Sequence, residues 1–149
     1  MRVQRVPIII LVAAALTVSA VAGTATAGEK LDRQRSKLLG WVNDYRHAHG
    51  LVRLRMEGGL NTLAQKHSTE MASRRTMFHT SDLGRRLAWR DPVVWGENVG
   101  YGTSIWWVFK AWTRSYWHNQ NLLKPRFRHT GIGVVRSGRY FWVTMIYYG

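Results

Sequence analysis

The chain of 149 residues contains no cysteine, so no disulfide bond can hold it together. Proline is scarce, with three residues, and only 8 acidic side chains stand against 22 lysines and arginines. A domain without disulfides must be held by the packing of its apolar side chains. The 8 tryptophans supply large surfaces for that packing.

The N-terminal segment has the pattern of a secretory signal peptide. Arg2 and Arg5 give a basic start, residues 7–21 are apolar, and Ala25-Thr26-Ala27 is an A-x-A cleavage signal. The apolar run falls short of the roughly 20 residues that a spanning helix needs, which favours cleavage over a retained anchor. We therefore expect a signal peptide at 1–27 and one secreted domain at 28–149. That domain would be extracellular or associated with the cell envelope, with no transmembrane segment after signal removal.

The charge of the chain is strongly one-sided. The net charge is +14, and it is +12 without Arg2 and Arg5. Outside the cell the counter-surfaces for such a protein are anionic wall polymers and phospholipid headgroups, so we expect no nucleic acid partner. General solubility is the alternative explanation, because charge alone names no partner. The local basic clusters are Arg74-Arg75, Arg85-Arg86 with Arg90, and Lys124 with Arg126 and Arg128.

Apolar side chains recur every three or four residues in several segments, which predicts helices. The first runs over about 29–47 and is ended by Gly50, and the second contains the apolar stripe of residues 60–71. Phe78-His79 is expected to close a helical stretch, and residues 81–87 add a short turn. Ser104 is the predicted N-cap of a further helix that runs to about residue 117.

The C-terminal segment alternates with a period of two. Residues 132–135 and 140–148 flank Arg136-Ser137-Gly138-Arg139, which predicts a β-hairpin, and Gly100-Tyr101-Gly102 is predicted to be a turn. Both faces of the last strand are apolar. An antiparallel strand of this kind must be covered on both sides. The predicted fold class is therefore α+β, a three-layer α-β-α sandwich around a small antiparallel sheet.

Three polar side chains in separate segments are the main candidates for a site. His79, Glu97 and His118 would form either a divalent-metal site or a buried polar network. Two imidazoles and a carboxylate suit Zn²⁺ or another divalent cation, with a position left for water. Buried polar groups, however, need hydrogen-bonding partners in any fold. Both interpretations remain open from the sequence.

No nucleophile stands out. Ser68 is adjacent to His67 on a predicted helix, where neighbouring positions do not face each other, and His67 is expected to be a core histidine. Ser115, three residues before His118, could pair with that imidazole, but no carboxylate nearby would orient it. We therefore assign no catalytic residue.

The order of motifs resembles the CAP superfamily (cysteine-rich secretory proteins, antigen 5, pathogenesis-related 1; SCP-like domains) in its bacterial secreted branch. The matching motifs are Asn43-x-x-Arg46, Leu60-x-x-Leu63-Ala64-x-x-His67-Ser68, Phe78-His79, Gly96-Glu97-Asn98, Trp112-x-x-Ser115-x-x-His118 and Gly131-Ile132-Gly133. The resemblance implies an α-β-α sandwich with a central cavity lined by two histidines and two acids. By motif these are His79, His118 and Glu97. The second acid has no counterpart, Ser115 lies in the nearest segment, and Trp117 would narrow the cavity.

Two functional hypotheses follow from the resemblance, since members of the family are reported to bind sterols, fatty acids or phospholipids. The first is a non-catalytic binding module for lipid or cell-envelope components. Its cavity would be lined by His79, Glu97, His118, Ser115 and Asn98. The alternative is a divalent-metal-dependent extracellular hydrolase with His79, Glu97 and His118 as ligands. A third hypothesis is an electrostatic wall adhesin for an anionic polymer. We expect no enzymatic turnover.

Overall fold

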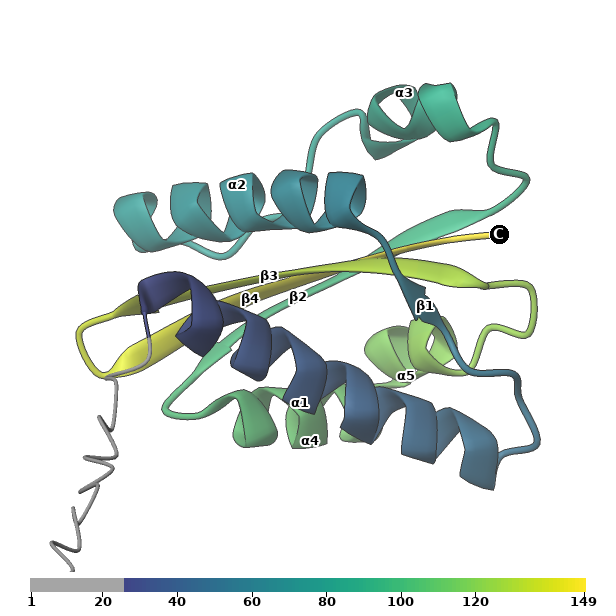
Figure 1. Ribbon diagram of the computed structural model, residues 1–149, viewed down its shortest axis with the longest axis horizontal. Coiled ribbons are helices and arrows are strands. Elements are labelled where there is room, and N and C mark those ends of the chain that lie inside the picture. Colours follow the sequence, from purple (N-terminus) through teal and green to yellow (C-terminus); the bar gives the residue numbers. More distant parts are fainter. Residues whose placement is uncertain (1–25) are drawn as a thin grey trace, which may run out of the picture.

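The computed structural model describes residues 26–149. The predicted signal peptide lies outside the described residues, apart from Thr26 and Ala27. Among the described residues no helix is both long enough and apolar enough to cross a membrane. The elements in order are α1 (Ala27–Ala48), β1 (Arg55–Met56), α2 (Gly58–Arg74), α3 (Leu83–Leu87), a 3-10 turn (Ala88–Arg90), β2 (Trp95–Gly102), α4 (Ile105–Arg114), α5 (Tyr116–Leu122), β3 (His129–Ser137) and β4 (Tyr140–Tyr148) (Figure 1).

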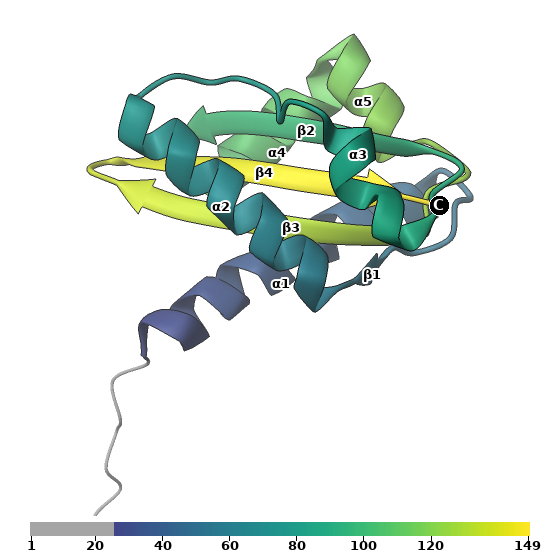
Figure 2. The same ribbon diagram turned by 90° about the horizontal axis from the view of Figure 1, so that it is seen from above.

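The four strands form one sheet between two helical layers. The strand order is β1-β3-β4-β2, and β2 therefore lies at an edge. Helices α2 and α3 cover one face, while α1, α4 and α5 cover the other (Figures 1 and 2). The predicted three-layer α-β-α sandwich is confirmed. The sheet is mixed rather than purely antiparallel, because the two-residue strand β1 pairs with β3 in parallel.

Strand β4 is buried on both faces, as its apolar alternation predicts. Ile146 packs with Leu60 and Ala64 of α2. Val143 and Met145 belong instead to the larger core that α1 and α4 complete. Because helices cover β4 on both sides, neither face of this central strand is polar. Contact with β4 also fixes the position of both helical layers.

Helix α2 packs unusually close to β3, and glycines make this possible. A Cβ atom built on Gly133 would lie 2.1 Å from the carbonyl oxygen of Ala64, and one on Gly131 would lie 2.2 Å from Leu60 Cβ. Any larger residue would have to push the helix backbone away from the sheet. The Gly131-Ile132-Gly133 motif therefore sets the distance between α2 and the sheet.

A buried arginine ties α1 to the segment that leads into β3. Arg46 is fully buried, and its guanidinium donates hydrogen bonds to four backbone carbonyls. The acceptors are Val52 (3.0 Å), Leu122 (2.8 Å), Lys124 (3.2 Å) and Phe127 (3.2 Å). Burial lowers the pKa of Arg46, but a guanidinium keeps its charge in proteins. Carbonyl dipoles thus take the place of a carboxylate partner.

Two expectations about the middle of the chain were wrong. The helix predicted from Ser104 to about residue 117 is two helices, because Ser115 adopts an extended backbone (ψ 124°) between α4 and α5. Gly100-Tyr101-Gly102 is the end of strand β2 and not a turn. In this strand the alternation is masked by glycines, whose lack of a side chain hides the period of two.

Phe78-His79 also lies outside any helix. Helix α2 ends at Arg74, and Arg75 follows in a left-handed conformation with φ 51°. The segment after it is a loop that runs back along the sheet toward β2. The loop brings His79 to the edge strand, and this position is what makes a site possible.

Substitution of alanine for Gly133 should destabilise the protein by about 3 kcal/mol, because the new Cβ meets the backbone of α2. Urea unfolding followed by circular dichroism measures this change. Gly40→Ala is the matched control. Gly40 lies within α1 with nothing within 4 Å of its added Cβ, so this change should stabilise the protein by about 0.5–1 kcal/mol. Equal effects at the two sites would contradict the packing argument.

Candidate functional site

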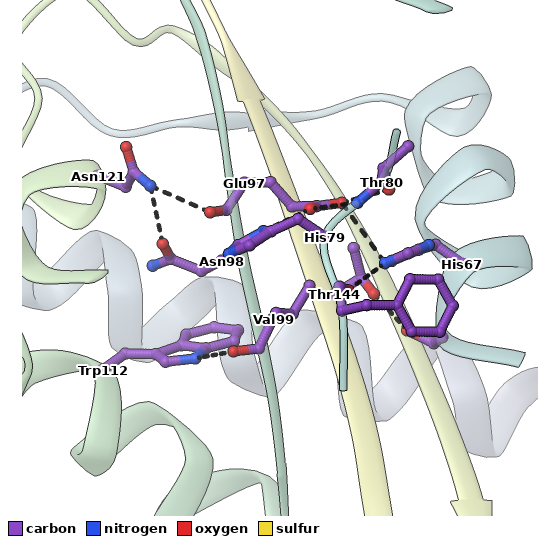
Figure 3. A network of polar contacts seen from close by, with 11 residues as sticks. His67, His79, Thr80, Glu97, Asn98, Val99, Trp112, Asn121 and Thr144 are labelled. Atoms are coloured by element: carbon purple, nitrogen blue, oxygen red, sulfur yellow. Dashed lines mark hydrogen bonds and ion pairs between the residues drawn. The ribbon is translucent and has the colours of Figure 1, made fainter. Parts of the chain in front are cut away.

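The site is built around two adjacent residues of the edge strand β2. Neighbouring side chains on a strand point to opposite faces of the sheet. Glu97 points toward the α2 layer and the loop that follows it, while Asn98 points toward α5 (Figure 3). Both are buried. One dipeptide therefore contacts both helical layers.

The carboxylate of Glu97 is enclosed by His79 and Thr80. Its Oε2 accepts hydrogen bonds from His79 Nδ1 at 2.8 Å and from the Thr80 backbone N–H at 2.9 Å. Its Oε1 accepts one from the Thr80 hydroxyl at 2.5 Å. Glu97 is only 8% exposed, so these donors replace the water that an ionised carboxylate would otherwise bind.

The contact with Glu97 fixes the tautomer of His79. An ionised carboxylate only accepts hydrogen bonds, so Nδ1 of His79 carries the proton and Nε2 of the neutral ring has a free lone pair. The His79 side chain is 64% exposed. Glu97 thus orients an accessible imidazole, as carboxylates do for metal-binding or proton-transferring histidines.

His67 borders the same carboxylate from helix α2. Its Nε2 donates a hydrogen bond to the carbonyl of Phe78 at 2.8 Å and lies 4.0 Å from Oε1 of Glu97. Because its side chain is almost fully buried and hydrogen-bonded, it is the core histidine that the sequence predicts. It holds the loop carrying His79 against α2.

Asn98 makes the equivalent connection on the other face. Its Nδ2 donates hydrogen bonds to the carbonyl of His118 (3.0 Å) and to the hydroxyl of Tyr147 (3.2 Å). Its Oδ1 accepts one from Asn121 Nδ2 at 3.0 Å. Burial raises the pKa of Tyr147, so the phenol stays protonated. Every polar atom of the Asn98 side chain thus has a partner.

Side chains from α4 and α5 also bind the backbone of the edge strand. Asn121 Nδ2 donates to the carbonyl of Glu97 at 3.1 Å, and Trp112 Nε1 donates to the carbonyl of Val99 at 3.0 Å (Figure 3). Unpaired groups on an edge strand invite pairing with another chain. These two donors occupy carbonyl groups of β2 that another chain would otherwise pair with, and so they protect this part of the sheet edge.

His118 lies in the first turn of α5. Its Nδ1 is 2.8 Å from Ser115 Oγ, and its ring stacks on Trp112 with centroids 6.3 Å apart. Burial lowers the pKa of His118, and its electrostatic interaction with the nearby His79 imidazole lowers it further, whereas the hydrogen bond with the backbone of Val99 opposes both. His118 is therefore neutral at neutral pH, and the two imidazoles influence each other.

The Ser115–His118 pair is not a complete catalytic triad. Within residues 26–149 no carboxylate bonds to His118, so the acid that orients the imidazole in a triad is missing from this pair. The two residues are three apart at the start of a helix, where such contacts form locally. Their hydrogen bond is accounted for by helix geometry.

The candidate residues are brought together in two groups rather than one. His79 and Glu97 are in direct contact, and Asn98 joins the group of Ser115 and His118. In the described part of the chain no set of three or more histidine, aspartate and glutamate side chains is placed to hold a metal ion. Both oxygens of Glu97 accept hydrogen bonds from Thr80 or His79, so a metal ion at this carboxylate would compete with those donors.

The accessible space beside His79 opens on the α2 side. A hollow of about 280 Å³ is lined by residues that include His67, His79 and Thr80. Trp117 does not roof a cavity, because it is 77% exposed and its ring meets that of Tyr116 edge-on at 4.9 Å. The narrowing expected from its bulk is therefore not present.

Two residues of the network were not identified from the sequence. Thr80 makes two hydrogen bonds to Glu97, and Asn121 bridges Glu97 and Asn98. Thr80 directly follows His79, and Asn121 follows His118 by three residues, so their nearness to the candidates was the available signal. Nothing in the residue types alone indicates which atoms they bind.

The sequence profile of the CAP family, described as the cysteine-rich secretory protein family, matches residues 39–147. The chain therefore belongs to the CAP family. A curated relative is the uncharacterized protein YkwD of Bacillus subtilis (strain 168), 28% identical over 123 residues, which are 77% of this chain and 48% of the relative. The chain thus spans about half the length of that protein.

Solved structures of similar fold come from several bacteria. An outer surface protein of Borrelia burgdorferi has a TM-score of 0.71 at 16% identity, with 78% of this chain and 92% of that chain covered. An extracellular protein containing a SCP domain from Bacillus anthracis has a TM-score of 0.67 at 23% identity, with 85% and 45% covered. These similarities confirm the fold.

NMR titration of the histidine rings should give His118 a pKa below its ordinary value of 6.5, because burial disfavours the imidazolium. The unfolded chain then binds the proton more readily, so stability falls as the pH drops from about 6.5 through the lowered pKa. His79→Ala should raise the pKa of His118 part of the way toward its ordinary value, because the interaction with His79 is removed. His47→Ala, at an exposed position on α1, should leave it unchanged, and an equal shift in both variants would contradict the proximity of His79 and His118.

Proposed function

We propose that this chain is a secreted, non-catalytic binding module for lipid or cell-envelope components. The B. anthracis relative is described as extracellular, which agrees with the signal-like N-terminus of this chain. In this proposal His79, Glu97 and His118, with Ser115 and Asn98, line the polar site at the β2 edge. The enclosed carboxylate of Glu97 maintains the shape of that site.

The observation that carries this proposal is a set of exposed aromatic side chains on the α4–α5 layer. Trp107, Tyr116 and Trp117 are 58%, 67% and 77% exposed. Contiguous exposed apolar surface marks an interaction site, and the rings of Tyr116 and Trp117 are in contact at 4.9 Å. Lys110 and Arg114 lie on α4 as well, and the residues from 28 onward have a net charge of +12. Indoles beside basic groups suit anionic headgroups at a membrane or wall surface.

The state of Glu97 argues against the alternative of a metal-dependent hydrolase. The carboxylate of Glu97 already accepts three hydrogen bonds from the loop that follows α2, so a metal ion or a proton would compete with these donors for its lone pairs. Catalytic zinc sites generally use three protein ligands. The geometry therefore supports a structural and orienting role for Glu97.

Metal binding is a second candidate function, because one structure of similar fold is described as containing Zn²⁺. It is a crystal structure of NaASP2 with Zn²⁺, with a TM-score of 0.60 at 13% identity, which covers 78% of this chain and 79% of that one. In the present chain the free Nε2 of His79 could take part in such binding. Two imidazoles without a carboxylate would give a weak site, so we derive no hydrolytic step from it.

The exposed tryptophans should contribute most of the binding to anionic vesicles. For vesicles of phosphatidylglycerol and phosphatidylcholine, the double variant Trp107→Ala, Trp117→Ala should bind about tenfold more weakly in co-sedimentation, because two indoles are lost from the interface. Val52→Ala, which truncates a side chain exposed to 51% outside α4 and α5, should change binding less than about twofold. The proposal fails if the wild type binds neither these vesicles nor lipoteichoic acid.

Binding should not require a metal. Elemental analysis of the purified protein should find substoichiometric zinc, and vesicle binding should persist in EDTA. Glu97→Gln should lower the free energy of unfolding by about 2 kcal/mol, since its amide cannot accept all the bonds of the carboxylate, yet leave binding intact. Glu70→Gln, at an exposed ion pair with Arg74, is the control and should cost less than about 1 kcal/mol. Stoichiometric zinc that is lost in Glu97→Gln would favour the hydrolase instead.

A further inference from the structure

A second hollow lies beyond the C-terminal end of α2. There the tip of β2 and the turn between β3 and β4 lie at the same end of the molecule as the last turn of α2 (Figures 1 and 2). The hollow has a volume of about 630 Å³, within the range of small-ligand sites. It is lined by Arg75, Met77, Tyr101, Ser137, Gly138, Arg139, Tyr140 and Trp142. None of the residues of the polar site lines it.

The floor of this hollow is a rigid aromatic surface. Tyr101 and Trp142 are paired across β2 and β4, and their rings are stacked 5.0 Å apart at an angle of 19°. Tyr140 meets Tyr101 edge-on at 5.7 Å. Trp142 is buried, but Tyr101 is 52% exposed, so the stack presents aromatic surface to a ligand. Flat aromatic surfaces of this kind accept the C–H face of a pyranose ring.

The rim of the hollow is basic. The Arg139 guanidinium lies 5.0 Å from the centroid of the Tyr140 ring and donates a hydrogen bond to its hydroxyl at 2.7 Å. Arg75 follows α2 in its left-handed C-cap conformation. Neither arginine forms an ion pair with any of residues 26–149, and the lining contains no acid. A planar guanidinium suits a carboxylate, which it can bind through two hydrogen bonds.

We propose that this hollow binds an anionic saccharide. Its pyranose ring packs on Tyr101 while its carboxylate pairs with Arg139 and Arg75. The Ser137 hydroxyl and the Gly138 backbone at the rim can bind ring hydroxyls. A shallow aromatic floor with a polar rim suits a sugar better than an acyl chain, which needs a deep apolar channel. The site is additional to the proposed envelope binding and uses none of the tryptophans of α4 and α5.

Titration calorimetry with two disaccharides tests the proposal. The probes are N-acetylglucosaminyl-N-acetylmuramic acid, which carries a carboxylate, and neutral diacetylchitobiose. The carboxylated disaccharide should bind at least about tenfold more tightly at low salt, as expected for one charge-assisted pair in a partly enclosed site. Arg139→Gln should remove most of this preference.

Matched variants separate the site from general charge and from misfolding. Arg53→Gln removes the same charge at an exposed position of a different hollow and should change affinity less than about twofold. Tyr101→Phe keeps the ring and should keep binding, whereas Tyr101→Ala should weaken it about tenfold. Circular dichroism checks the fold of each variant.

Three outcomes would overturn the proposal. The first is equal affinity for the two disaccharides or no binding of either. The second is an equal effect of Arg139→Gln and Arg53→Gln. The third is a combination of two results: the wild type binds neither disaccharide, and Arg139→Gln loses binding to anionic vesicles. This combination would identify the ligand as a phospholipid. None of these outcomes depends on Trp107 or Trp117. A failure of the saccharide proposal is therefore distinguishable from a failure of the proposed envelope binding.

Discussion

The opposite orientation of Glu97 and Asn98 on one edge strand is the constraint on which the site depends. A strand turns successive side chains to opposite faces, so this dipeptide must bond to both helical layers at once. Glu97 is satisfied by the loop after α2, and Asn98 by α5 and Tyr147. Removing a partner from a buried carboxylate costs several kcal/mol, about 3–5 in known cases, so both layers are held in register.

The same network accounts for the chemistry available at the site. Its hydrogen bonds occupy the carboxylate, orient His79 with Nε2 outward, and place a neutral His118 on the other side of the strand. A site of this kind presents polar edges and one oriented, accessible imidazole to a ligand. The exposed aromatic side chains and the basic surface then provide the apolar and electrostatic parts of recognition.

Much of the fold could be predicted from the sequence, because long periodic segments depend on burial alone. The doubly apolar strand β4 predicted both helical layers, and the apolar stripes located α1 and α2. Strand β2 was missed because Gly96, Gly100 and Gly102 interrupt its alternation. The break at Ser115 and the role of Thr80 depend on contacts between distant segments, and local patterns do not contain that information. The candidates His79, Glu97 and His118 were identifiable by type, but their division into two groups was not.

Native-state hydrogen exchange of Glu97→Ala tests the role of the dipeptide most directly. The Thr80 amide, which donates to Glu97 at 2.9 Å, should lose its protection. The amides of Asn119 in α5 and of Leu123 at its C-cap, on the Asn98 side, should keep theirs. An unchanged Thr80 amide, or equal loss of protection on both faces, would contradict the account in which each residue anchors its own layer.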